Sequence, residues 1–461
     1  MVHASGMDTT EGQQILDRFR RAVYRDVLGR RKDSAFELME AALISSGPRT
    51  LVRLSLEPVF RRGWPSACDG LADGTLDADA LRERLAAALV PPPAGARPVW
   101  AADGTTWPRP AAATVAERTF AHMVTAGIPQ SGVVPGWEYQ WLFAIPEAAG
   151  SWALPLDERR RGPAAGSPTE LLLAQLADVL PHLPADYPRP VLTADSSYDA
   201  VVLAARVQDP DPEKRLAIDI LVRLSPRRCF YRPPPPYPGR GAPAKHGPVL
   251  KLWDPETHPA PDRRAVGHDP RHGEVRVDVW VGLHARKAAD VPLTPVRVRV
   301  EHLPRSARSP KPLWLAFAGE LPADLLDLWR WYARRYTCEH AFRFLKHDLG
   351  WTTARPGDPE AADRWSGLLA LALWQLWLAR ALVTDRRLPW ERPADPERLS
   401  PGRVRRAFAG LLPALGSPAR PARARGKSPG RRPGSCPGPR ERHPVFRRAR
   451  KKAKPKAKAA A

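Results

Sequence analysis

Apolar residues recur at helical spacing near the start of the chain, at Ile15, Phe19, Val23, Val27, Phe36, Leu38, Met39, Ala42 and Leu43. An acidic stretch that begins at Asp77 suits the start of a further helix, because negative charge is stabilised at a helix N-terminus. A Pro- and Gly-rich stretch over residues 91–96 then interrupts the pattern, as a linker does. We therefore predict a helical N-terminal domain over residues 1–95. Its arginines would allow DNA binding, and a solvated helix face is the alternative.

Strand patterns alternate with helical patterns after this linker. Apolar runs of strand length cover residues 98–103, 136–144, 151–155 and 189–195, and helical periods cover 169–183 and 200–207. Strands followed by helices indicate an α/β fold with a mixed sheet. Two of the strands end in an acid, at Asp103 and Asp195. We assign residues 96–215 to the first part of this α/β core.

Strand patterns dominate the next hundred or so residues, at 216–224, 275–281, 295–300 and 312–317. The first two are separated by a Pro-rich, basic excursion over residues 231–248. We expect a β-rich insertion over residues 216–320. Helical patterns return at 323–346 and 360–383, so residues 321–416 are assigned to the second part of the core.

The most apolar stretch of the chain covers residues 367–383. It carries Gln375 and Arg380 and is short for a membrane span, which needs roughly 20 apolar residues. We therefore predict a buried core helix there, and no membrane partner.

The net charge of the chain indicates a class of binding partner. The formal net charge is +23, and residues 417–461 contain 16 Lys and Arg against a single acid, Glu441. This composition predicts a disordered basic tail. A basic chain is expected to meet a polyanion, most plausibly nucleic acid, although a solubilising tail has the same composition. The four cysteines lack zinc or disulfide spacing and the N-terminus lacks an apolar signal core, so we expect a cytoplasmic, nucleoid-associated protein.

Three acids are candidates for binding metal ions. Asp103 and Asp195 stand at strand ends, and Glu339 lies within a helical pattern. Mg²⁺ prefers oxygen ligands and keeps positions open for water and phosphate. Two such ions about 4 Å apart can activate a water and stabilise the leaving oxygen of a phosphodiester. A single acid at a strand end is commonly a surface residue, and Asp199 is a rival to Asp195.

The helical pattern around Glu339 carries three further polar residues, Tyr332, Arg335 and Lys346. On an ideal helix with about 100° per residue, the four side chains project within an arc of about 60°. Arg335 and Glu339 could be a simple surface ion pair, since they are four residues apart. That alternative leaves Tyr332 and Lys346 unexplained. We therefore predict one helical face that combines a metal-binding carboxylate with groups that contact DNA.

The spacing Y-x2-R-x3-E-x6-K in YARRYTCEHAFRFLK resembles the YREK signature of DDE-class transposases of bacterial insertion sequences. AADGTTWPRP resembles the family segment that holds the first acid, at Asp103, and VLTADSSYDAVVL resembles the segment of the second, at Asp195. The stretch LGWTTARPGDPEAADRWSGLLALALWQLWLAR is similar to the sequence that follows the third acid. The resemblance covers the chain from about residue 98 to its end.

The resemblance implies an RNase H-like catalytic core with a β-strand insertion. Asp103, Asp195 and Glu339 would be the catalytic, metal-binding acids, with two Mg²⁺ or Mn²⁺ ions, and Tyr332, Arg335 and Lys346 would bind DNA. The implied activity is cleavage at terminal inverted repeats and joining to target DNA, by a homodimer on paired ends. Some relatives stack a flipped base on a Trp of the insertion, for which Trp253 and Trp280 are candidates, although a Trp on an alternating strand is more often a core residue. A catalytically decayed DNA-binding protein and an RNase H-like nuclease without joining activity are the alternatives.

Overall fold

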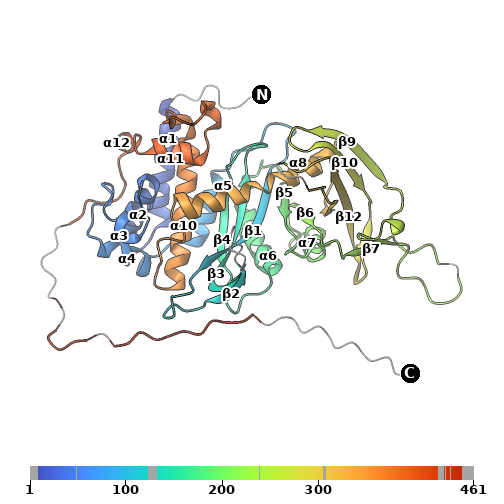
Figure 1. Ribbon diagram of the computed structural model, residues 1–461, viewed down its shortest axis with the longest axis horizontal. Coiled ribbons are helices and arrows are strands. Elements are labelled where there is room, and N and C mark those ends of the chain that lie inside the picture. The colour runs from blue at the N-terminus through green and yellow to red at the C-terminus, as the bar shows by residue number, and fades with distance from the viewer. Residues whose placement is uncertain are drawn as a thin grey trace.

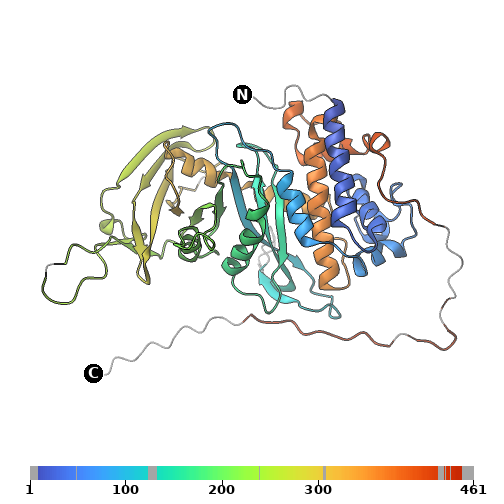
Figure 2. The same ribbon diagram turned by 180° about the vertical axis from the view of Figure 1, so that it is seen from behind.

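The structure is a computed structural model that describes residues 9–47, 49–122, 132–237, 239–304, 308–423, 430, 432–436 and 438–448. Parts of the expected basic tail, residues 424–429, 431, 437 and 449–461, lie outside the described residues. A helical half and a β-rich half stand on either side of a central sheet (Figure 1). The turned view shows the same arrangement from behind (Figure 2).

Five strands form the centre of the sheet: β1 (Val99–Pro108), β3 (Val133–Ile145), β4 (Leu154–Arg160), β5 (Val191–Ala194) and β6 (Asp219–Arg223). They lie in the order β4-β3-β1-β5-β6. β3 is antiparallel to β1 and β4, whereas β1, β5 and β6 run parallel. This is the strand order of an RNase H-like sheet, and the predicted mixed α/β fold is confirmed.

The remaining strands are β2 (Thr119–His122), β7 (Cys229–Tyr231), β8 (Val249–Lys251), β9 (Arg263–Asp269), β10 (Gly273–Val279), β11 (Leu283–Ala285), β12 (Ala288–Val300) and β13 (Leu313–Ala318). β2 extends the sheet beside β3. At the other edge β13 pairs with β6, and β12 pairs with β13, so the β-rich half continues the central sheet. β6 is therefore the fifth core strand, and the excursion from the core begins after Arg223 rather than at residue 216.

The helical half combines both ends of the sequence. It contains α1 (Thr9–Ala22), α2 (Lys32–Ile44), α3 (Leu51–Leu54), α4 (Pro65–Ala72), α5 (Ala78–Ala87), α10 (Pro359–Ala379), α11 (Pro401–Phe408) and α12 (Leu412–Leu415). α10 contacts α1, α2 and α11, and it also packs on β4. One buried apolar cluster consequently runs from Leu16 through the sheet to Ala419.

α10 is the apolar helix that the sequence predicts. By length and composition it could cross a membrane, but 72% of its most apolar window is buried inside the protein. Trp365 and Trp374 are fully buried in it, and the Trp374 indole donates to the Pro155 carbonyl at 2.7 Å. The prediction of a buried core helix is confirmed.

The two faces of the central sheet are covered by different helices. Consecutive strand residues point to opposite faces of a sheet, so the contacts of Gln140 and Trp141 on β3 show which helices cover each face. Gln140 bonds Gln175 of α6 (Pro168–Val179) at 2.7 Å, and α7 (Ala200–Val207) contacts α6. Trp141 packs edge-on against Trp351 with ring centroids 5.7 Å apart. Trp351 follows α8 (Leu326–Arg334), α9 (Thr337–Arg343) and the π-helical turn η4 (Phe344–Asp348).

Candidate active site

Asp103 and Asp195 lie where two parallel strands separate. The pairing of β1 with β5 ends at Ala102 opposite Ala194, so each acid is the next residue on its strand. Asp195 follows the end of β5, as predicted. Asp103 does not end a strand, because β1 continues along β3 to Pro108. The prediction that a strand ends at Asp103 is therefore wrong. Asp103 nevertheless directly follows the end of the pairing between β1 and β5, as Asp195 does.

The segment that carries Tyr332, Arg335, Glu339 and Lys346 is not one regular helix. α8 ends at Arg334 and α9 begins at Thr337, and the amides of Arg335 and Glu339 donate three residues back, at 3.1 Å each. Such bonds tighten the turn, and the π-helical turn η4 then widens it. The prediction of a continuous ideal helix is wrong, and the angles calculated from it do not apply.

Two of the four side chains nevertheless contact β1 directly. The Arg335 guanidinium pairs with Asp103, with Nη1 2.7 Å from Oδ2. The Lys346 ammonium donates to the Thr105 hydroxyl at 2.5 Å. The guanidinium of Arg335 also lies 6.0 Å from the centre of the Tyr332 ring. The irregular segment thus aims Arg335 and Lys346 at the strand that carries the first acid.

The three acids influence one another electrostatically. The pKa of Asp103 is raised to about 6: burial is the main cause, the charges of Asp195 and Glu339 act in the same direction, and Arg335 opposes the shift. Burial lowers the pKa of Lys346, against the opposing charges of Glu339 and Asp103. The site therefore holds negative charge in a partly buried environment, and a bound cation would reduce the repulsion between the carboxylates.

The donor set fits a hard divalent cation. Asp103, Asp195 and Glu339 offer only carboxylate oxygens, which Mg²⁺ and Mn²⁺ accept alongside several waters. Within the part of the chain that the structure describes, no group of three or more His, Cys, Asp or Glu side chains is placed so that it could hold a metal ion. Arg335 holds Asp103 Oδ2, so its guanidinium stands where a cation would bind. Binding of an ion at Oδ2 would compete with this contact of Arg335.

Asp195 and Asp199, the two candidates for the second acid, differ in their contacts. The Asp199 carboxylate caps α7 by accepting from the Val201 amide at 3.0 Å, and it pairs with Arg228 at 3.6 Å. Asp195 instead acts on Asp103 and on the phenol of Tyr332. Asp199 thus has a role in starting a helix, which its position before an apolar helical period could have indicated.

Three further residues at the site escaped sequence reasoning. Tyr198 is 4% exposed, and burial together with the charges of Asp103 and Asp195 raises its pKa. The Cys338 thiol is fully buried, and burial and the charge of Asp103 keep its pKa well above the usual range. It is therefore a protonated packing group. Thr105 accepts from Lys346 and, being two residues after Asp103, lies on the same strand face. The two-residue spacing from Asp103 could therefore have identified Thr105 in the sequence.

The two candidate tryptophans of the β-rich half differ in access. Trp280 is fully buried, and its indole donates to the Pro259 carbonyl at 3.0 Å. It also packs against Trp314, with ring centroids 5.4 Å apart. Trp280 is therefore a core residue, which is the alternative that its alternating strand favours, and its buried ring is not available for base stacking in this structure. Trp253 is 53% exposed and stays a candidate.

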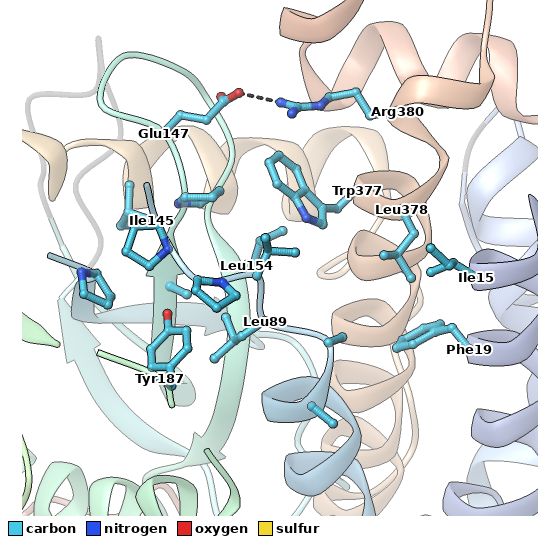
Figure 3. Close-up of a pocket in the computed structure, with 18 of the residues that line it drawn as sticks. Ile15, Phe19, Leu89, Ile145, Glu147, Leu154, Tyr187, Trp377, Leu378 and Arg380 are labelled. Atoms are coloured by element: carbon cyan, nitrogen blue, oxygen red, sulfur yellow. Dashed lines mark hydrogen bonds and ion pairs between the residues drawn. The ribbon is translucent and has the colours of Figure 1, made fainter. Parts of the chain in front are cut away.

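A cavity of about 860 Å³ lies near the start of β1, away from the acids. Figure 3 shows Leu89, Leu154 and Trp377 around it, and the Glu147–Arg380 ion pair beside it. Arg334 also lines it, and burial lowers the pKa of this guanidinium to about 10. The cavity walls are mostly apolar and carry no acid besides Glu147 among the described residues, so the cavity is not the candidate active site.

A sequence model of the DDE superfamily endonucleases matches residues 23–285 of the 461 residues. The chain belongs to this family. The match includes the candidate acids Asp103 and Asp195 and ends before the third candidate, Glu339, of this DDE superfamily endonuclease. No curated protein matches the chain by sequence.

The DDE superfamily endonuclease also has a match among solved structures. The cryo-EM structure of the piggyBac transposase synaptic complex with hairpin DNA is similar over 90% of this chain and 74% of that chain. The two share 10% sequence identity, and the TM-score is 0.42.

Proposed function

We propose that this DDE superfamily endonuclease is a transposase of the YREK group, encoded by a bacterial insertion sequence. It cuts DNA at the element's terminal inverted repeats and joins the freed 3′ hydroxyl to target DNA. The observation that carries the proposal is the contact of Arg335 with Asp103 and of Lys346 with Thr105 on β1, where the charges of Asp195 and Glu339 also act on Asp103. Acidic and basic side chains thus occur together at the site, as simultaneous contact with metal ions and DNA phosphates requires.

Asp103, Asp195 and Glu339 would hold two Mg²⁺ or Mn²⁺ ions. When bound, such ions activate a water or hydroxyl and stabilise the leaving oxygen of the phosphodiester. Arg335, once released from Asp103, presents its guanidinium to a phosphate, for which its planar fork is suited. Burial raises the pKa of Tyr332, so its phenol stays protonated and can donate a hydrogen bond to DNA. Lys346, held by Thr105, supplies a further positive charge.

The proposed partner is DNA, bound as terminal inverted repeats and as target. Two element ends must be brought together before joining, so we propose a homodimer on paired ends. Its DNA substrate places the protein in the cytoplasm with the nucleoid.

A strand-transfer assay tests the proposal. The purified protein is incubated with Mg²⁺, labelled duplexes that end in the element's terminal repeats, and a supercoiled target plasmid. We expect cleaved ends with free 3′ hydroxyls, followed by covalent joining of label to plasmid. Cleavage without joining would indicate a nuclease instead. Binding without cleavage would indicate a decayed protein.

Metal binding is expected to weaken as the pH falls below about 6. The pKa of Asp103 is raised to about 6, so below that pH an ion must displace a proton. We expect Mn²⁺ affinity, measured by calorimetry between pH 5 and 8, to be constant above pH 7. It should fall by about tenfold per pH unit below pH 6. Because the folded-state pKa lies above the unfolded value, the metal-free protein should lose stability as the pH rises from about 4 to 6.

The control is Asp103→Asn, in which this pH dependence should disappear together with most of the affinity. Constant Mn²⁺ affinity across pH 5–7 in the wild-type protein would contradict the assignment of Asp103 as a ligand.

A further inference from the structure

The cavity of about 860 Å³ near the start of β1 is bounded by segments that are far apart in the sequence. α1, the segment after α5, the start of β4 and the end of α10 all contribute to its walls. Apolar side chains form most of the lining, and Figure 3 shows Phe19, Leu89, Leu154, Trp377 and Leu378 around the space. Ligand sites in proteins have volumes of about 300 to 1,000 Å³. The cavity is therefore large enough to hold a small organic molecule.

The charged side chains of the cavity are unequal in number. Four arginines and one acid line it: Arg18, Arg84, Arg334, Arg380 and Glu147. The Glu147 carboxylate already pairs with Arg380 at 2.5 Å, and Arg84 pairs at 3.3 Å with an acid that does not line the cavity. Within the described part of the chain, neither Arg18 nor Arg334 takes part in an ion pair. The cavity therefore has an excess of positive charge.

Arg334, the last residue of α8, is the mostly buried member of the two unpaired arginines, whereas Arg18 is exposed. Its Nη2 donates to the Ile145 carbonyl at the end of β3, and its buried Nε has no hydrogen-bond partner. Burial also lowers the pKa of the guanidinium, as expected of a cation held away from water. A buried cation without a paired anion is costly, so an anion bound in the cavity would stabilise Arg334.

We propose that the cavity binds an apolar monocarboxylate, with its chain or ring among the apolar side chains and its carboxylate on the Arg334 guanidinium. The planar fork of arginine matches the two oxygens of a carboxylate. Tyr187 also lines the cavity, and because burial raises its pKa, its phenol stays protonated and can donate a hydrogen bond to the same anion. This site lies away from the candidate acids and its ligand is not the DNA, so it is independent of the proposed function.

The charges of the cavity select against other classes of small molecule. An apolar cation would lack a partner, because the only acid of the lining is already paired with Arg380. A neutral alcohol would fill the apolar space but leave the Arg334 charge without a counter-ion. A second anionic group on the ligand would lie against apolar walls, which is unfavourable for a charge. A single carboxylate on an apolar body is thus the ligand that the lining fits.

Three probes with the same ten-carbon chain test this selection in the full-length, metal-free protein without DNA. They are decanoate, decan-1-ol and decyltrimethylammonium, and binding is measured by calorimetry near neutral pH. We expect decanoate to bind with one site per chain, about tenfold or more tightly than decanol, because a hydrogen-bonded ion pair adds to the apolar contact. The cation should bind more weakly than both.

Two variants separate the charge from the space. Arg334→Met should weaken decanoate binding by about tenfold or more and leave decanol binding unchanged, because only the guanidinium is lost. Arg330→Met is its matched control, since Arg330 lies on the same helix, is exposed and does not line the cavity. It should change neither affinity. Ala88→Trp fills part of the cavity from a partly exposed position and should abolish binding of both probes.

Equal affinities of the wild type for decanoate and decanol would overturn the proposal, even if Arg334→Met did not fold. Unchanged decanoate binding in a folded Arg334→Met, or in Ala88→Trp, would overturn it as well. Decanoate binding by a chain that begins at Thr9, but not by the full chain, would mean that residues 1–8 occupy the cavity and not a ligand.

Discussion

Replacing Glu339 with glutamine is expected to reduce cleavage of DNA ends by about 10³-fold or more, equivalent to roughly 4 kcal/mol of transition-state stabilisation. Glutamine keeps the shape of the side chain but lacks the charge that a metal ligand needs. Affinity for uncleaved DNA should change by less than about twofold, because Arg335 and Lys346, which would bind the phosphates, remain. Cleavage rates under single-turnover conditions and binding by fluorescence anisotropy provide the two measurements.

A readout independent of activity accompanies this variant. The charge of Glu339 is one of the causes that raise the pKa of Asp103, so Glu339→Gln should lower that pKa. It can be followed by carbon NMR of the Asp103 carboxyl. Glu320→Gln, at an exposed acid just before α8, is the matched control and should leave both properties unchanged. Undiminished cleavage by Glu339→Gln would remove Glu339 from the site.

The parts of the fold with strong local patterns could be predicted from the sequence. The apolar period of α10 and the strands that precede Asp103 and Asp195 are examples, because burial of a helix or strand leaves a repeating signature. The motif spacing also identified Arg335 and Lys346, which both contact β1. The ideal helix assumed for Arg335 and Lys346 was wrong. Hydrogen bonds from an amide to the carbonyl three residues earlier, and a π-helical turn, have no distinct sequence pattern.

Features built from distant backbone pairing could not be predicted. β6 was assigned to the insertion, although it pairs with β5. An apolar strand pattern does not indicate which other strand it pairs with. The pairing of Phe446 with Arg118 and Phe120 uses backbone amides and carbonyls, and every residue type except proline carries both. Tyr198 stood within the quoted second motif, but the sequence does not show that the charges of both Asp103 and Asp195 act on its buried phenol.

Replacing Arg20 with leucine is expected to lower the free energy of unfolding by about 3 to 5 kcal/mol, because it leaves a buried carboxylate without its partner. Arg20 is fully buried on α1, where it bonds the Glu40 carboxylate on α2 and the Gly416 carbonyl, the latter at 2.9 Å. Glu40 is 1% exposed. The pair therefore connects α1, α2 and the start of the tail, and urea unfolding followed by far-UV circular dichroism would measure its loss.

The pH dependence of the stability lost in Arg20→Leu distinguishes an unpaired Glu40 carboxylate from a packing defect. Burial raises the pKa of Glu40 above its unfolded value, and losing Arg20 removes the largest opposing charge, so the shift should grow in Arg20→Leu. The protonated carboxyl is then favoured in the folded state. The variant should thus lose stability, relative to the wild type, as the pH rises through the folded-state pKa of Glu40, and recover it in acid. Combining Arg20→Leu with Glu40→Leu should restore most of the stability at pH 8. An equal loss at pH 5 and pH 8, unchanged in the double variant, would mean that lost packing and not the unpaired charge of Glu40 destabilises the helices.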